Sequence, residues 1–229
     1  TPLNAIMGFS EVMKKQYLGP VNNPRYLDYA GDIHSSGRYL LGIINDILDL
    51  SKIEAGKFTI ERLPFALKST IDDAIGLVAP QAREKGLALH CALAPDVPEV
   101  VLGDPSRLRQ VLLNLLSNAI KFTQQGCVEL DVSVSAEADG NELLRCVVTD
   151  TGVGIAHEQQ DQVFNPYAQE SASTARRFGG TGLGLSISRH LIELMGGHIG
   201  FTSEPGLGSR FYFTLPSRRE TQPEPRPSS

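Results

Sequence analysis

The sequence predicts an α+β protein in two parts, a helical hairpin followed by an α/β sandwich domain. Through residues 1–56, apolar residues recur at helical spacing on either side of one turn rich in Gly, Asn and Pro. Residues 57–216 instead alternate helical stretches with short runs of β-branched residues. Residues 217–229 contain Pro, Ser and charge without periodicity, so this stretch is expected to form a disordered tail.

The hairpin is predicted as helices over residues 3–17 and 26–53, joined by the turn "LGPVNNP". The second helix carries a heptad pattern in which seven of eight positions are apolar. These positions are Tyr26, Tyr29, Ile33, Ser36, Leu40, Ile43, Ile47 and Leu50. Such a stripe needs a partner helix. It could form the core of the hairpin itself, but two helices bury too little, so we favour half of a dimeric four-helix bundle.

The second part is predicted to hold three helices and five strands. In chain order these are helix 68–85, strand 87–93, helix 105–122, strands 128–136 and 143–149, helix 183–195, and strands 198–203 and 208–215.

The composition of the chain limits which kinds of binding partner and which cellular compartment are expected. Asp and Glu outnumber Lys and Arg by 26 to 21, a net charge of −5, so no overall positive field favours nucleic acid. No membrane contact is expected within this chain. The three cysteines lack metal-type spacing, which indicates reduced thiols acting as small core residues in the cytoplasm. The sequence is compatible with a longer parent protein anchored in the inner membrane.

The stretch "RLRQVLLNLLSNAIKFT" is the most informative for chemistry. Its apolar residues share one helical face, whereas Asn114, Asn118 and Lys121 share another. The simpler interpretation is the solvated face of a surface helix, but such faces usually carry Glu and Lys rather than Asn, which has poor helix propensity. Amide oxygens suit Mg²⁺, and a Lys ammonium neutralises phosphate charge.

Two glycine-rich stretches are individually weak signals. "DTGVGI", residues 150–155, follows a β-branched run and offers the Asp150 carboxylate beside a backbone that a flat ligand could approach, although a plain tight turn is the commoner meaning. "GGTGLGL", residues 179–185, opens a predicted helix, where exposed N–H groups bind anions, or where a flexible loop simply ends.

Taken together and in this order, the motifs resemble the catalytic region of bacterial sensor histidine kinases of two-component systems. "NLLSNAIKFT" resembles the family's Asn-rich helix, "DTGVGI" its first Gly motif, "VFNPY" its Phe motif and "GGTGLGL" its second Gly motif. The resemblance extends to about residue 216 and implies an ATP-binding domain of the histidine kinase and Hsp90-like type.

The resemblance implies ATP and Mg²⁺ as ligands, with Asp150 on the adenine amino group, Lys121 on phosphate, and Asn114 and Asn118 on the metal ion. Residues 165–181 would be the ATP lid, with Asn165 where the family commonly has an acidic residue. The other nucleotide-binding positions would be Gly152, Gly154, Ile155, Phe164, Tyr167, Gly180, Thr181, Gly182, Leu183 and Gly184, together with Asn118.

The same fold serves ATPases of the chaperone, mismatch-repair and gyrase type. Those families resemble one another in a Glu four residues before the second Asn, a base that activates water, whereas this chain has Asn114, which cannot accept a proton at neutral pH. ATP hydrolysis is therefore disfavoured, and a side chain is the expected phosphoryl acceptor.

The family's acceptor helix reads His-Glu/Asp-x-x-Thr/Asn-Pro-Leu, and "TPL" matches it from Thr1 onward. The acceptor His would precede Thr1 by four residues, and Thr1 itself matches the position associated with dephosphorylating the partner. None of the five histidines present fits the pattern. The chain is thus expected to bind Mg-ATP without autophosphorylating alone. Its expected partners are a second copy and a response-regulator receiver domain, and the alternative is a non-catalytic, ATP-responsive scaffold.

Overall fold

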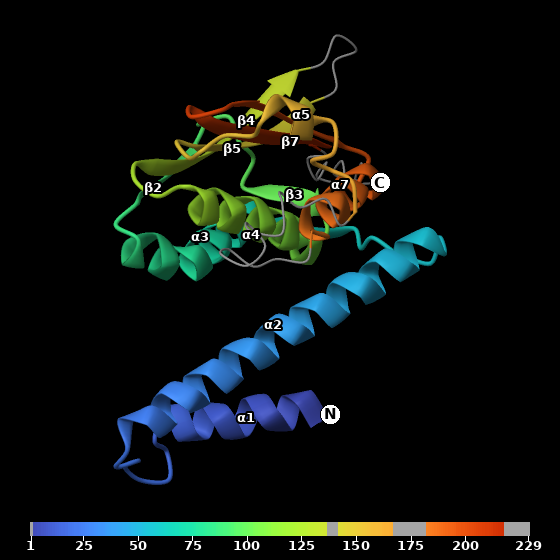
Figure 1. The fold of residues 1–229 in the computed structure, drawn as a ribbon. Helices are drawn as coiled ribbons and strands as arrows, with labels where there is room; N and C mark the ends of the chain where they lie inside the picture. Colours follow the sequence, from blue (N-terminus) through green and yellow to red (C-terminus); the bar gives the residue numbers. More distant parts are fainter. Residues whose placement is uncertain (1, 137–141, 167–181, 218–229) are drawn as a thin grey trace. The chain divides into compact units, whose positions relative to one another are not determined.

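The computed structural model describes residues 2–136, 142–166 and 182–217, and the chain forms two compact units, Thr1–Phe58 and Thr59–Ser229 (Figure 1). Each unit is described by itself. The first is a helical hairpin and the second is a mixed sheet covered by helices, as predicted.

The hairpin consists of α1, Pro2–Lys14, and α2, Pro24–Glu54. The start of α2 follows from its sequence, because the Asn23 side chain accepts a hydrogen bond from the Arg25 N–H at 3.0 Å and Pro24 occupies the first turn. The first helix ends earlier than the predicted residue 17, because Gln16 adopts a left-handed conformation with φ 53°.

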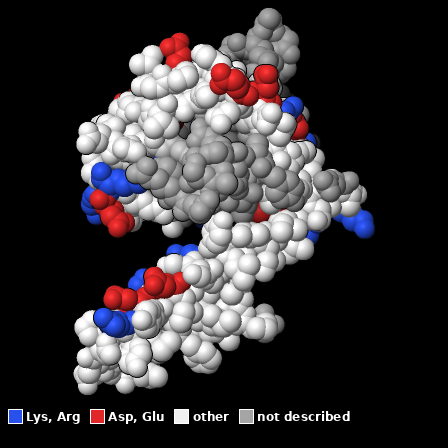
Figure 2. All heavy atoms as spheres, in the orientation of Figure 1, with Lys and Arg blue, Asp and Glu red and all other residues white. Residues whose placement is uncertain are grey.

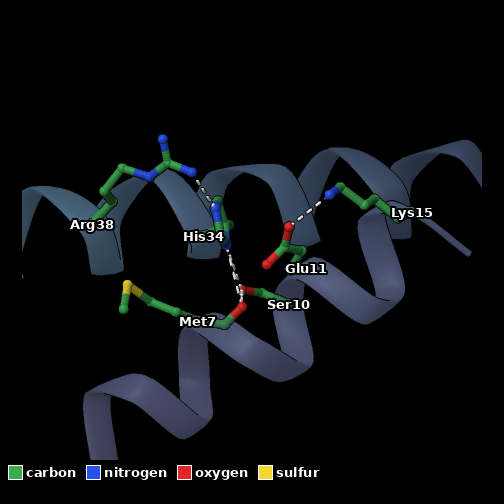
Figure 3. Close-up of polar contacts among 6 residues, drawn as sticks. All are labelled: Met7, Ser10, Glu11, Lys15, His34 and Arg38. Carbon is green, nitrogen blue, oxygen red and sulfur yellow. Dashed lines mark hydrogen bonds and ion pairs between the residues drawn. The ribbon is translucent and has the colours of Figure 1, made fainter. Parts of the chain in front are cut away.

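One face of α2 packs against α1. Its buried residues are Ala30, His34 and Gly37, and a Cβ added to Gly37 would lie 3.0 Å from the Met7 Cγ. The His34 ring lies between the Arg38 guanidinium and the Met7 carbonyl and Ser10 hydroxyl of α1 (Figure 3). This histidine therefore occupies the hairpin core.

The heptad stripe lies on a different face of α2. Its first-position residues are exposed: Tyr26 at 62%, Ile33 at 45%, Leu40 at 48% and Ile47 at 45%. The side of the hairpin seen in Figure 2 is mostly uncharged; acidic and basic side chains lie along one edge, and further basic side chains lie at the end away from the α1–α2 turn. In the single chain α1 does not cover these four side chains, and the choice between a hairpin core and a dimer stays a prediction.

The second unit is built on a five-stranded sheet in the order β2-β4-β5-β7-β6. The first pair is parallel and the others are antiparallel. The strands are β2, Ala88–Leu93; β4, Cys127–Ala136; β5, Glu142–Asp150; β6, His198–Glu204; and β7, Gly208–Pro216. All five were predicted to within one residue at each end.

Three helices lie against one face of this sheet (Figure 1). They are α3, Leu67–Glu84; α4, Pro105–Phe122; and α7, Gly184–Leu194. The core forms between them and the strands, where Leu112 and Leu116 of α4, Leu130 of β4 and Phe213 of β7 are fully buried. Of the three cysteines, Cys146 lies in this core as predicted, but Cys91 is exposed, so its prediction was wrong.

Sequence patterning missed three short elements. A two-stranded antiparallel sheet joins β1, Leu63–Ala66, to β3, Val100–Gly103, and α5 is a single turn, His157–Gln160. Strands of four residues are too short to show alternation, and Pro64 inside β1 argues against a strand at the sequence level.

Candidate functional site

Helix α4 carries the predicted polar face. Its boundaries were predicted correctly because its start is strongly encoded: the Asp104 carboxylate accepts from the Ser106 and Arg107 N–H groups, each at 3.1 Å, and Pro105 begins the helix. The apolar face is buried in the core, whereas Asn114, Asn118 and Lys121 are half-buried at its edge.

The first Asn of this face meets the start of α7. The Asn114 Nδ2 donates to the Ser188 hydroxyl at 2.9 Å, and its Oδ1 accepts from the Asn118 Nδ2 at 3.4 Å. A Cβ added to Gly184 would overlap the Asn114 carboxamide. The structure therefore brings together the Asn-rich helix and the second glycine stretch, which the sequence separates by about seventy residues.

Ser188 was missed by sequence reasoning. It is 2% exposed and lies one helical turn after Gly184, on the same face of α7. That spacing from a predicted site glycine was the only signal available. The predicted site residue Leu183 is 1% exposed, so its side chain belongs to the core. Gly182, also predicted for the site, adopts a left-handed backbone conformation with φ 71°.

Asp150 ends β5 and is 7% exposed. Its Oδ1 accepts from the Gly152 N–H at 2.8 Å, and the Ser209 backbone N–H also bonds to the carboxylate. Burial raises the pKa of this carboxyl, and the two backbone donors partly oppose that shift. The result is a desolvated carboxylate that is only partly compensated.

The loop after Asp150 is packed tightly. A Cβ on Gly152 would lie 2.7 Å from both the Asp150 Oδ1 and the Phe122 carbonyl oxygen, and Gly154 has φ 68° with its Cα facing the Glu204 carbonyl. The Ile155 N–H donates to the Ser203 hydroxyl at 2.9 Å. Packing alone accounts for both glycines, and it fixes the loop between the end of α4 and β6.

Phe164 belongs to an aromatic cluster on the sheet. Its ring packs edge-on against Phe201 and Phe211, with ring centroids 5.8 and 6.4 Å apart, and the Arg189 guanidinium of α7 lies 5.9 Å from the Phe164 centroid.

The Lys121 Nζ lies 4.7 Å from the centroid of the Phe122 ring. Thr1, Tyr167, Gly180 and Thr181, with residues 167–181 of the predicted lid, lie outside the described residues.

These side chains combine an accepting carboxylate with two amides and an ammonium group. A half-desolvated carboxylate at the end of β5 can accept from an exocyclic amino group, while two amides and an ammonium on α4 can meet a metal ion and phosphate. In the described part of the chain no cluster of three or more His, Cys, Asp or Glu could hold a metal ion.

The chain was compared with known proteins. Residues 103–219 match the family described as histidine kinase-, DNA gyrase B- and HSP90-like ATPase, and residues 1–56 match the His kinase A (phospho-acceptor) domain. The sensor histidine kinase GacS of Pseudomonas protegens is 45% identical over 94% of this chain, and BarA of Escherichia coli is 43% identical over 94%. The chain spans 23% of the length of each of these relatives.

Two solved structures share the fold of this chain. Full-length ShkA in complex with AMPPNP is 32% identical, with a TM-score of 0.74 over 94% of this chain and 43% of its own. The Acinetobacter baumannii histidine kinase AdeS, 21% identical, shares the fold with a TM-score of 0.64 over 96% of both chains. Within the described residues, no helix is both long and apolar enough to cross a membrane. By its two matched domains and its relatives, the chain belongs to the sensor histidine kinases of two-component signal transduction.

Proposed function

We propose that this chain binds Mg-ATP and directs its γ-phosphoryl group to a histidine of a dimerisation helix, for passage to an aspartate of a response-regulator receiver domain. The observation that carries this proposal is the contact of Asn114 with Gly184 and Ser188, which unites the Asn-rich face of α4 with the start of α7. The name of one similar structure includes a bound ATP analogue, AMPPNP, which supports a nucleotide at the corresponding site.

Each polar residue then has one role. The Asp150 carboxylate accepts from the adenine amino group, because it is buried and its two backbone donors only partly offset that burial, so a further N–H donor is favoured. Lys121 neutralises phosphate charge, and the N-terminal N–H groups of α7, at Gly184 and beyond, bind a phosphate oxygen. Asn118 and Asn114 supply amide oxygens toward Mg²⁺, which when bound offsets the charge of the transferred group.

The acceptor is proposed to be a side chain rather than water. Asn114 occupies the position where a general base would activate water, and an amide cannot accept that proton. Phosphoryl transfer depends mainly on positioning and charge neutralisation, which this site provides. Because the matching acceptor motif places the histidine four residues before Thr1, these 229 residues are proposed to bind Mg-ATP without labelling themselves.

One paired measurement tests the proposal. Calorimetry should show Mg-ATP binding at one site per chain, and incubation with γ-labelled ATP should leave the same protein unlabelled. Absence of binding would refute the nucleotide site. Stoichiometric label on this chain would refute the assignment of the acceptor, and steady release of phosphate would favour a hydrolase.

A further inference from the structure

Lys85 lies directly after α3 and reaches the C-terminal end of α4. Its ammonium nitrogen lies 2.7 Å from the Ile120 carbonyl oxygen, 2.8 Å from that of Lys121 and 3.3 Å from that of Thr123. These are long-range contacts, between residues 35 to 38 positions apart in sequence. No sequence motif marked this residue.

The Lys85 ammonium and the backbone carbonyls that it contacts are chemically complementary. A Lys ammonium has three N–H donors and no acceptor, and the last carbonyls of a helix have no partner within the helix. The C-terminal end of a helix also carries partial negative charge, so the cation is favoured there on electrostatic grounds. One side chain therefore satisfies three backbone acceptors and ties the end of α4 to α3.

The turn held by Lys85 is the part of α4 that meets the nucleotide loop. It contains Lys121, and the Phe122 carbonyl packs against Gly152 and accepts from the Val153 N–H at 3.4 Å. The Thr123 hydroxyl donates to the Ala119 carbonyl at 2.7 Å. A shift of this turn would move the Lys121 side chain and the support of the Asp150 loop together.

We propose that Lys85 is a positioning residue for nucleotide binding, which holds the turn Lys121–Thr123 in the geometry that both the phosphate-binding Lys and the adenine-binding loop require. This inference rests on the proposed function of the site. Lys85 is not proposed to contact the nucleotide itself. It acts through the backbone carbonyls of α4.

The test compares Lys85→Met with Val78→Ala. Methionine keeps the length of the side chain but removes its donors, while Val78 is a buried core residue of α3, about two helical turns before Lys85. Both variants should lower the melting temperature. Only Lys85→Met should weaken Mg-ATP binding, by about tenfold, as expected when charge-assisted hydrogen bonds are lost. Lys85→Arg, which keeps charged donors, should restore most of the affinity.

A second readout needs no nucleotide. Amide hydrogen exchange at Phe122 and Thr123 should be faster in Lys85→Met than in Val78→Ala. The two variants are compared at temperatures equally far below their own melting temperatures. Equal Mg-ATP affinity in Lys85→Met and the wild type would overturn the proposal and leave Lys85 a stabilising residue only. If the wild-type chain failed to bind Mg-ATP, the proposed function would fall, and the exchange rates would still show whether Lys85 holds the turn.

Discussion

Asp150 shows how one residue combines a structural and a binding demand. Its carboxylate already accepts from the Gly152 N–H, at Oδ1, and from the Ser209 N–H, and the proposed adenine contact adds a further donor. In Asp150→Asn, the amide oxygen can keep the Gly152 bond, but an NH₂ group would then face the adenine amino group. We expect Mg-ATP binding to weaken by about 1.5–3 kcal/mol, measured by calorimetry, with no fall in melting temperature. Unaltered affinity in a folded variant would contradict the adenine role.

The same carboxyl gives a prediction for pH. Because burial raises the pKa of Asp150 in the folded chain, the folded state binds this proton more tightly than the unfolded state does. Its contribution to stability is therefore present below the ordinary Asp pKa of about 3.9 and is lost as pH rises through the raised value. The Asn side chain of Asp150→Asn does not ionise, so the variant does not lose this stability as pH rises. Urea unfolding should show the variant gaining on the wild type as pH rises from 4 toward about 7, and a constant difference would contradict the assignment.

Nucleotide binding should follow the opposite trend. Only the ionised carboxylate accepts on the oxygen proposed for adenine, so the Mg-ATP affinity of the wild type should fall as pH drops through the raised pKa of Asp150. The affinity of Asp150→Asn should not show this component. The same trend with pH in both proteins would assign the effect to the phosphates or to another group.

Gly184 is a glycine whose role can be separated from helix propensity. A Cβ there would overlap the Asn114 carboxamide, which is the end of a side chain and can move. In Gly184→Ala we therefore expect Asn114 to be displaced from Ser188 and Mg-ATP binding to weaken by about 1 kcal/mol, the scale of one hydrogen bond, while stability changes little. The control is Gly76→Ala on α3, where an added Cβ meets nothing within 4 Å. Equal affinities in the two variants would show that the Asn114 position is not needed.

At the scale of elements, local signals explain what could be predicted. Helix α4 was predicted to the residue because Asp104, Pro105 and the apolar period all lie within its own sequence. The proximity of Asn114 to Gly184 came from the resemblance and not from any local rule. Ser188 and Lys85 could not be found, because their partners are 74 and about 35 residues away in sequence and only the fold brings them together.

A polar contact centred on His34 lies in the core of the hairpin. An Arg can only donate, so the Arg38 bond at 2.8 Å makes the His34 Nε2 an acceptor, and the Nδ1 hydrogen then points to the Met7 carbonyl at 3.2 Å (Figure 3). His34→Ala removes this bridge between α1 and α2. We expect faster hydrogen exchange in both helices, equivalent to about 1–2 kcal/mol of lost local stability.

The matched control is Lys15→Ala, which breaks the ion pair with Glu11 seen beside this contact (Figure 3). That pair is solvent-exposed, and surface ion pairs contribute little to stability. Exchange rates in α1 and α2 should therefore stay close to those of the wild type. Equal rates in the His34 and Lys15 variants would show that the core histidine does not hold the helices together.

At the scale of the whole molecule, the sequence predicted a hairpin followed by a sandwich, because helical apolar spacing gives way to helical stretches that alternate with short β-branched runs. It could not say which face of α2 meets α1. The face that meets α1 carries small and polar residues, Ala30, His34 and Gly37, which permit close approach and hydrogen bonding. The first-position heptad residues, Tyr26, Ile33, Leu40 and Ile47, remain exposed. Patterning identifies an apolar stripe, but the partner of that stripe depends on which surfaces fit.

The exposed stripe leads to a prediction about assembly. Tyr26, Ile33, Leu40 and Ile47 expose 45% or more of their surface in the single chain, which is unfavourable in water unless another helix covers them. We propose that a second copy does so, forming the four-helix bundle expected from the heptads. Leu40→Glu places a charge in that interface. We expect it to weaken dimerisation at least about tenfold by sedimentation equilibrium, since burying an unpaired charge is costly.

The control variant is Asn45→Glu, which adds the same charge at an exposed position of α2 outside the heptad stripe. It should sediment as the wild type does, because a charge facing water disturbs no interface. Both variants should keep the Mg-ATP affinity of the wild type, since nucleotide binding is assigned to the second unit alone. A wild-type chain that sedimented as a monomer, or a Leu40→Glu chain that stayed as dimeric as Asn45→Glu, would contradict the stripe as the dimer interface, and the heptad residues would then need a different partner.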